Sequence, residues 1–189
     1  MALRSGWLKA PWRRAERESD DPYWDFFINV PPADRANSVL DVIRKAPEGN
    51  VFPTRADLHT PEVTTSHVKE MARYLGADLV GVTTLDADDA GHPFAVVCAV
   101  RAADDPRQAR GIGGQVPVQN GLFVTFVLSA WIRELGYRAS VAASPDAARL
   151  AVAAKLGTLD RTGRLVTAEY GRRVHVADVI RTDLPLATA

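Results

Sequence analysis

The chain has 189 residues with 23 basic and 23 acidic side chains, so its formal net charge at neutral pH is zero. A balanced charge excludes the broad positive field with which proteins attract nucleic acids or anionic membrane surfaces. With 47% hydrophobic residues, the length suffices for one well-filled core and is short for two. We therefore expect one folded core, with neither nucleic acid nor membrane among its partners.

Cys98 is the one cysteine in the sequence. A disulfide needs two thiols and an iron–sulfur cluster commonly takes four, so neither can form from this chain alone. Cys98 lies in an apolar run and is predicted to be buried rather than nucleophilic. The four histidines show no paired spacing, and the acidic stretch 86–91 lacks the closing glutamate of a calcium loop. No metal site is predicted.

Residues 1–60 are predicted to form an aromatic-rich arm followed by a short helix over 35–45. The arm holds three of the four tryptophans, so we expect it to pack on the body or on a second subunit; a partly ordered arm without a role is the alternative. Arg13 and Arg14 are not followed by an apolar signal core, which favours a cytoplasmic protein.

Residues 61–189 are predicted to form the core domain. Thr60 and Pro61 carry the cap and the first position of a helix that ends at Gly76. Three strands and two further helices are predicted, in these ranges: strands over 79–82, 94–100 and 138–142, and helices over 122–135 and 144–156. The glycine-rich stretch 103–121 is predicted to be a loop. This order of elements favours an α+β or α/β architecture.

Turn glycines divide the last third of the chain. Two strands are predicted there, over 165–167 and 174–180, and we expect them to pair as a hairpin. In the second strand, His175 should point with Ala177 and away from the neighbouring valines. The turn 160–163 contains Gly163, and its backbone amides either face a ligand or belong to an ordinary hairpin turn.

The segment LGTLDRTGRLVTAEYGRRV, residues 156–174, is followed by TDLPL at 182–186. Together they resemble a motif of the reductive dehalogenases and the related epoxyqueuosine reductases, and a weaker resemblance extends upstream to Pro61. The resemblance implies an α+β fold of the nitroreductase-like sandwich type, with a central mixed or antiparallel sheet flanked by helices. It also implies a corrinoid cofactor and a homodimer.

The resemblance places the cofactor contacts in the same segment. The implied cofactor-binding residues are Leu156, Gly157, Arg161, Gly163, Leu165 and Arg173. Arginine forks suit the carboxamide, carboxylate and phosphate groups that such a cofactor carries. Tyr170 is the candidate catalytic residue, as a proton donor, and packing in a turn is its alternative role.

The sequence also departs from the family pattern. Lys155 and Asp160 stand where the family has glycines, and Ala168 stands where a proline is usual. The acids expected of the family have no counterpart, because Ala142 aligns with the aspartate of the epoxyqueuosine branch. The tyrosine that precedes the central helix in the dehalogenase branch is absent from the stretch 101–135.

Three functions stay open from the sequence. The first is a cobalamin-binding, dehalogenase-like reductase that acts on a small molecule without iron–sulfur clusters of its own. Because the cluster-binding cysteines that follow TDLPL in the family are missing, its electrons are expected from an external donor protein. The second is a corrinoid carrier without catalysis. The third is a nitroreductase-like enzyme that uses FMN, whose phosphate would suit arginines beside turn amides.

Overall fold

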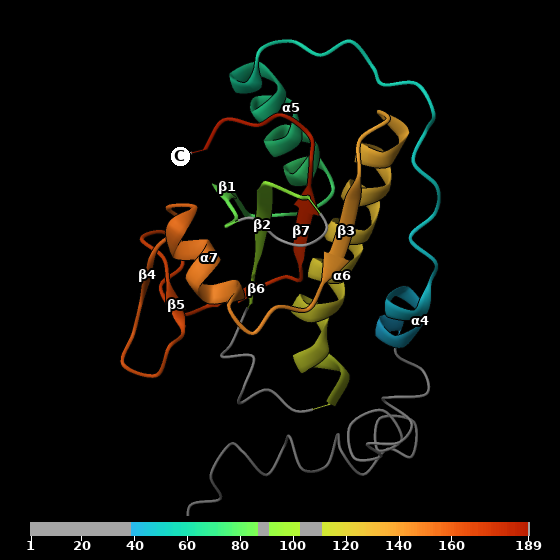
Figure 1. Ribbon diagram of the computed structural model, residues 1–189. Helices are drawn as coiled ribbons and strands as arrows, with labels where there is room; N and C mark the ends of the chain where they lie inside the picture. Colours follow the sequence, from blue (N-terminus) through green and yellow to red (C-terminus); the bar gives the residue numbers. More distant parts are fainter. Residues whose placement is uncertain (1–38, 87–90, 103–110, 189) are drawn as a thin grey trace, which may run out of the picture.

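A computed structural model describes residues 39–86, 91–102 and 111–188 (Figure 1). The helices and strands follow in this order: α4 (Val39–Lys45), α5 (Pro61–Tyr74), β1 (Leu79–Thr84), β2 (Phe94–Arg101), α6 (Gly111–Glu134), β3 (Ala139–Ala142), α7 (Ala147–Ala153), β4 (Thr158–Leu159), β5 (Leu165–Val166), β6 (Val174–Val176) and β7 (Val179–Thr182). The predicted α+β class is confirmed. The predicted aromatic arm, residues 1–38, lies outside the described residues.

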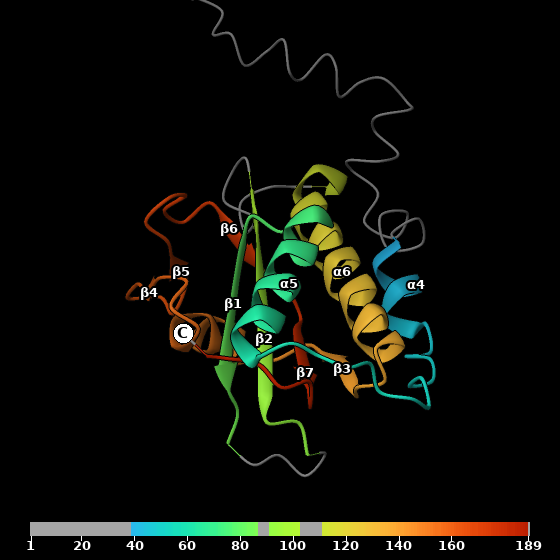
Figure 2. The same ribbon diagram turned by 90° about the horizontal axis from the view of Figure 1, so that it is seen from above.

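The main sheet is antiparallel, with strand order β1-β2-β7-β3 and with β6 also beside β2. Helices α5 and α6 cover one face, and α7 with the β4–β5 hairpin covers the other (Figure 2). Strand β2 is buried on both faces: Val96 and Cys98 join the core under α5 and α6, whereas Val97 joins the smaller core under α7. The predicted burial of Cys98 is confirmed, and burial raises the pKa of its thiol to about 12.

Close packing of α7 on the sheet depends on Gly81 in β1. A Cβ at this position would lie 2.8 Å from the Cβ of Ala154, which is closer than side chains pack. Gly81 pairs with Val97, so both residues face the smaller core. The missing side chain therefore sets how near α7 and the hairpin that follows it approach the sheet.

Helix α6 begins at Gly111, so the predicted loop was wrong for residues 111–121, while residues 103–110 lie outside the described part. Gly121 explains the error, because a Cβ there would lie 2.9 Å from the Cβ of Ala177. The glycine lets a helix approach the sheet closely instead of making a loop. None of the described helices is long and apolar enough to cross a membrane.

The predicted hairpin of strands 165–167 and 174–180 was also wrong. Strand β5 pairs with β4, and the second stretch divides into β6 and β7, which both pair with β2. The pairs Val96↔Ile180 and Ala99↔Val176 are three residues apart along β2 and four apart along the other segment. The extra residue is a bulge, and such an irregularity cannot be read from the alternation of side chains.

The orientation predicted for His175 is confirmed. His175 and Ala177 both lie against α6 at Gly121, whereas Val174 and Val176 belong to the core under α7.

The terminal motif 182–186 ties β7 to the start of β3. The hydroxyl of Thr182 donates to the carbonyl of Arg138 at 2.7 Å and accepts from the amide of Leu184 at 3.0 Å. The carboxylate of Asp183 accepts from the amide and the Nε of Arg138 at 2.7 and 3.0 Å, and from Arg55 at 3.0 Å. Leu184 and Leu186 are buried in the main core, so the motif supports the fold through its apolar as well as its polar side chains.

Candidate functional site

A groove of about 310 Å³ opens beside the β4–β5 hairpin. The start of α7, the turn before β5 and strand β6 form its walls, through these residues: Pro145, Ala147, Ala148, Gly163, Arg164, Leu165, Val174, His175 and Val176. Most of these side chains are apolar. Of the six residues predicted to bind the cofactor, Gly163 and Leu165 line the groove.

The turn that carries Gly163 is organised by Asp160. One carboxylate oxygen accepts from the amide and the hydroxyl of Thr162 at 2.8 and 2.7 Å, and from the amide of Arg164 at 3.0 Å. The carbonyl of Asp160 accepts from the amide of Gly163 at 3.0 Å. These three amides point into the turn, so the hypothesis that they face a ligand was wrong: Asp160 itself takes the place of an anion.

Asp160 stays ionised far into the acid range. The hydrogen bond from the Thr162 hydroxyl, followed by the amide of Arg164, lowers the pKa of this carboxyl to about 2, and Arg172 adds to the effect. The Nε of Arg172 lies 3.1 Å from the second carboxylate oxygen. Arg172 is therefore used to hold the turn, unlike Arg161 and Arg173.

Arg161 and Arg173 are exposed to solvent. Neither guanidinium has a hydrogen bond or an ion pair with another side chain or carbonyl in the described part of the chain. Arg161 belongs to the turn that contains Gly163, and Arg173 precedes the groove residue Val174. Both side chains thus remain available to an anionic or amide-bearing ligand at this end of the molecule.

Leu156 and Gly157 lie in packed positions outside the groove. A Cβ at Gly157 would collide with the carbonyl of Val166, so glycine is needed for the close pairing of β4 and β5. Leu156 packs in the smaller core, next to Gly81 of β1. The structure assigns both residues a packing role that supports the hairpin.

Tyr170 is partly buried and packs against the smaller core, to which the groove residues Leu165 and Val174 also belong. A hydrogen bond with Glu169 raises the pKa of its hydroxyl, with partial desolvation as the next cause. The neighbouring Glu169 therefore makes the Tyr170 hydroxyl a weaker acid, which disfavours it as a proton donor.

Sequence reasoning missed the α7 side of the groove. Ala147 and Ala148 line it, and α7 begins only at Ala147 because residues 145 and 146 form a turn. The signal that was available is the pair of small residues directly after Ser144 and Pro145, since small side chains at a helix start leave space in front of it.

No family model matches the sequence, and no curated protein matches it. Among solved structures, a reductive dehalogenase studied for B12-dependent dehalogenation has a TM-score of 0.69 and 27% identity, over 79% of this chain and 23% of that chain. The catabolic reductive dehalogenase NpRdhA, solved in complex with 3-bromo-4-hydroxybenzoic acid, gives the same four values. The chain thus spans about a quarter of the length of these dehalogenases.

A second group of solved structures is less similar. Epoxyqueuosine reductase from Bacillus subtilis has a TM-score of 0.46 and 17% identity, over 67% of this chain and 47% of that chain. This similarity is too low to establish a shared fold. The likeness to the reductive dehalogenases predicted from the sequence is confirmed by structure, over about a quarter of the length of those proteins.

Proposed function

We propose that this protein binds a corrinoid, with the groove between α7, β5 and β6 as one wall of the binding site. The observation that carries the proposal is the structural similarity to B12-dependent reductive dehalogenases, at a TM-score of 0.69 and 27% identity. The segment that carries the sequence motif is also the segment beside which the groove opens. Fold similarity and site position therefore support the same ligand class.

The residues of the groove fit part of a corrinoid. The alanine, leucine and valine side chains of the wall suit the edge of a macrocycle, and the polar surface between them suits its amide side chains. The exposed Arg161 and Arg173, which lie outside the lining, suit the phosphate of its nucleotide tail. A volume of about 310 Å³ lies at the small end of ligand sites, so this chain would hold one part of the cofactor. A nitroreductase-like sandwich and a homodimer, whose second subunit would supply further contacts, belong to the same proposal.

When bound, a corrinoid supplies a cobalt centre that carries electrons to the substrate. Replacing a halogen by hydrogen takes two electrons and one proton and releases a halide ion. One cysteine in 189 residues is too few for an iron–sulfur cluster, so the electrons must come from a donor outside this sequence. We propose a separate donor protein in the cytoplasm.

The proton donor is the least well supported part of a reductase proposal. Ala142 ends β3 where an acid is expected, and Tyr170 is the proposed donor although Glu169 beside it raises the pKa of its hydroxyl. These two observations favour, as a second candidate, a corrinoid carrier that binds without turnover. The FMN alternative is less well supported, because the turn amides on which it depended are bonded to Asp160.

Corrinoid binding is tested by mixing the purified protein with hydroxocobalamin and removing free ligand on a desalting column. We expect the cobalamin absorption bands to remain with the protein. The double variant Arg161→Gln/Arg173→Gln should bind cobalamin at least about tenfold more weakly, because two charged contacts are lost. For cobinamide, which lacks the nucleotide tail, the double variant should lose less affinity relative to the wild-type protein.

A control for the loss of a surface arginine is Arg149→Gln, which removes one positive charge. Arg149 is an exposed α7 residue paired with Asp146 and absent from the groove lining. Equal losses in the control and in the double variant would contradict specific recognition. If no cobalamin is retained by the wild-type protein, the proposal is wrong.

Catalysis is tested on the loaded protein with titanium(III) citrate as the chemical reductant and 3-bromo-4-hydroxybenzoic acid as substrate. Bromide release that exceeds the release by free cobalamin and falls in Tyr170→Phe would support the reductase. Binding without such release would support the carrier.

A further inference from the structure

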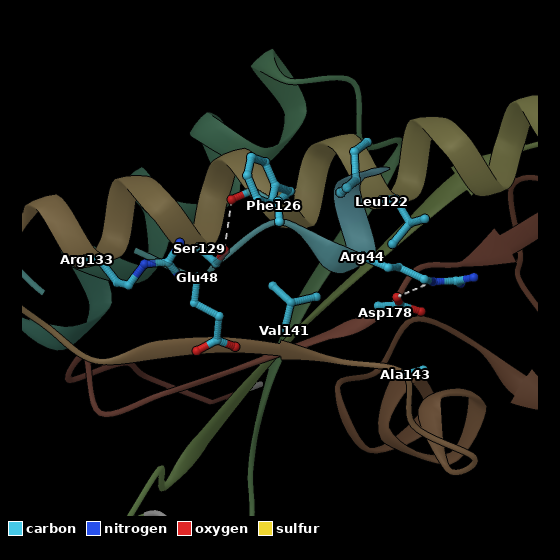
Figure 3. A pocket seen from close by; sticks show the side chains of 11 residues that line it. Arg44, Glu48, Leu122, Phe126, Ser129, Arg133, Val141, Ala143 and Asp178 are labelled. Atoms are coloured by element: carbon cyan, nitrogen blue, oxygen red, sulfur yellow. Dashed lines mark hydrogen bonds and ion pairs between the residues drawn. The ribbon is translucent and has the colours of Figure 1, made fainter. Parts of the chain in front are cut away.

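A second cavity, of about 270 Å³, lies between α4, α6, β3 and the β6–β7 connection (Figure 3). Its lining residues are Ile43, Arg44, Ala46, Glu48, Leu122, Phe126, Ser129, Arg133, Val141, Ala143 and Asp178. It shares none of them with the groove beside the hairpin. The cavity is therefore a separate site, and it does not depend on corrinoid binding.

One stripe of α6 forms the long wall of the cavity. Leu122, Phe126, Ser129 and Arg133 recur at intervals of three or four residues and so share one face of the helix. Figure 3 shows Arg133 at one end of the cavity, the Arg44–Asp178 pair at the other, and Phe126 between them. The cavity thus has two charged ends and a middle formed by Phe126 and Val141, with Glu48 and Ser129 beside Arg133.

The two charged ends differ in how well their charges are compensated. Arg44 and Asp178 form an ion pair at 3.6 Å, which neutralises that end and joins α4 to the β6–β7 connection. Arg133 is 4% exposed. In the described part of the chain its guanidinium makes one hydrogen bond, to the carbonyl of Ala139 at 2.8 Å, and no ion pair.

A buried guanidinium with one neutral partner is incompletely satisfied, because it offers five donors and a full charge. Burial lowers the pKa of Arg133, while Glu48 and Glu134 oppose that shift from a distance. Glu48 lines the cavity but is exposed, and no ion pair joins it to Arg133. A carboxylate placed inside the cavity would meet the free donors of Arg133 in the planar geometry that guanidinium prefers.

We propose that this cavity binds a small carboxylic acid with a compact apolar body, such as an aromatic acid. The carboxylate pairs with Arg133, and the apolar body lies against Phe126 and Val141 between the two charged ends. Glu48 weakens the binding by like-charge repulsion and thereby favours ligands with a single negative charge.

The experiment uses the full chain labelled with ¹⁵N, with benzoate as the probe and benzamide as its neutral counterpart. Benzoate should cause saturable shifts of the amides of Ser129, Val141 and Ala143, with a Kd of about 1 mM or tighter. Benzamide should bind at least about tenfold more weakly, since it lacks the charge. An absence of saturable shifts with benzoate, or equal binding of benzamide, would overturn the proposal.

Four variants sharpen the test. Glu48→Gln should tighten benzoate binding by about threefold, whereas the matched change Glu70→Gln, at an exposed α5 residue outside the cavity, should leave it unchanged. Arg133→Lys should weaken binding by about tenfold, because a lysine lacks the planar fork. Ala143→Trp fills the cavity from an exposed position and should abolish binding.

Because Arg133 also holds Ala139, the Ala143→Trp variant decides the outcome if Arg133→Lys does not fold. Unchanged benzoate affinity in Ala143→Trp would place the probe elsewhere and refute the site.

Discussion

Residues 182–186 and residues 156–174 use their polar groups in opposite ways. Thr182 and Asp183 bind Arg138, which is 44 and 45 residues away in the sequence. The carboxylate of Asp160, by contrast, accepts hydrogen bonds from residues two and four positions away, and only the ion pair with Arg172 reaches further. One segment joins distant parts of the fold, and the other mainly organises itself.

The two segments resemble the dehalogenase motif together, but the resemblance has a different structural basis in each. Long-range bonds fix β7 against β3, so the terminal segment supports the fold, and it lines neither of the two cavities described above. The locally organised segment leaves Arg161 and Arg173 exposed near the groove, and we propose that it is the part that holds a ligand. Likeness in the terminal segment therefore supports the architecture, whereas likeness in the hairpin segment supports the cofactor.

The largest effect is expected at Asp183, whose side chain is 11% exposed and accepts from two arginines and a backbone amide. Asp183→Ala should lower the free energy of unfolding by about 3 kcal/mol, because these donors lose their partner. The measurement is urea unfolding. Asp146→Ala, at an exposed residue with one surface ion pair, is the control, and an equal loss in both variants would contradict a structural role for the terminal segment.

Two glycines of the hairpin segment give the next effect. Gly157→Ala should cost about 2 kcal/mol, because its Cβ would collide with the carbonyl of Val166. Gly163→Ala should cost about 1 kcal/mol, since the only penalty is its φ of +75° and the space around it is open. Thermal unfolding compares the two. The reverse order would show that the β4–β5 pairing is looser than described.

A smaller effect, of opposite sign, is expected at Lys155. This residue follows the end of α7 with a φ of +59°, at the position where the family has glycine. Lys155→Gly should stabilise the protein by about 1 kcal/mol, because glycine has no Cβ penalty in this conformation. Lys155→Ala keeps the penalty and should give no gain. Equal stability of the two variants would argue against the left-handed conformation.

The smallest effect is expected in the pH dependence of the turn at Asp160. Folding depresses the pKa of this carboxyl from 3.8 to about 2, so its contribution to stability is complete above pH 3.8 and is lost as the pH falls towards 2. An NMR titration of the Asp160 carboxyl should show this midpoint. Asp160→Asn should flatten the acid limb of the stability curve. A midpoint near 3.8 would mean that the turn is not organised as described.

The sequence predicted the elements whose signals are local. The cap at Thr60 and the apolar run of β2 needed no distant partner to be recognised. Partner choice was missed, because the pairing of β5 with β4 and the bulge between β6 and β7 depend on packing across the sheet. The loop predicted around Gly121 was wrong for the same reason, because a glycine that allows a helix to pack closely on a sheet looks, in the sequence, like a glycine of a loop.

The candidate site was predictable only in part. Gly163 and Leu165 followed from the motif, whereas the α7 wall consists of alanines that carry no chemical signal. The cavity at α6 could not be foreseen, because Arg133 looks like an exposed arginine until tertiary packing buries it. Burial is a property of the whole fold.

The most direct measurement of the central claim compares the same two segments in one experiment. Adding hydroxocobalamin to ¹⁵N-labelled protein should shift or broaden the amide signals of residues 147–148, 163–165 and 174–176, which line the groove. The amides of residues 182–184 and 186 should stay unchanged. Unchanged signals throughout, or changes confined to the terminal segment, would contradict the assignment of the hairpin segment to cofactor binding.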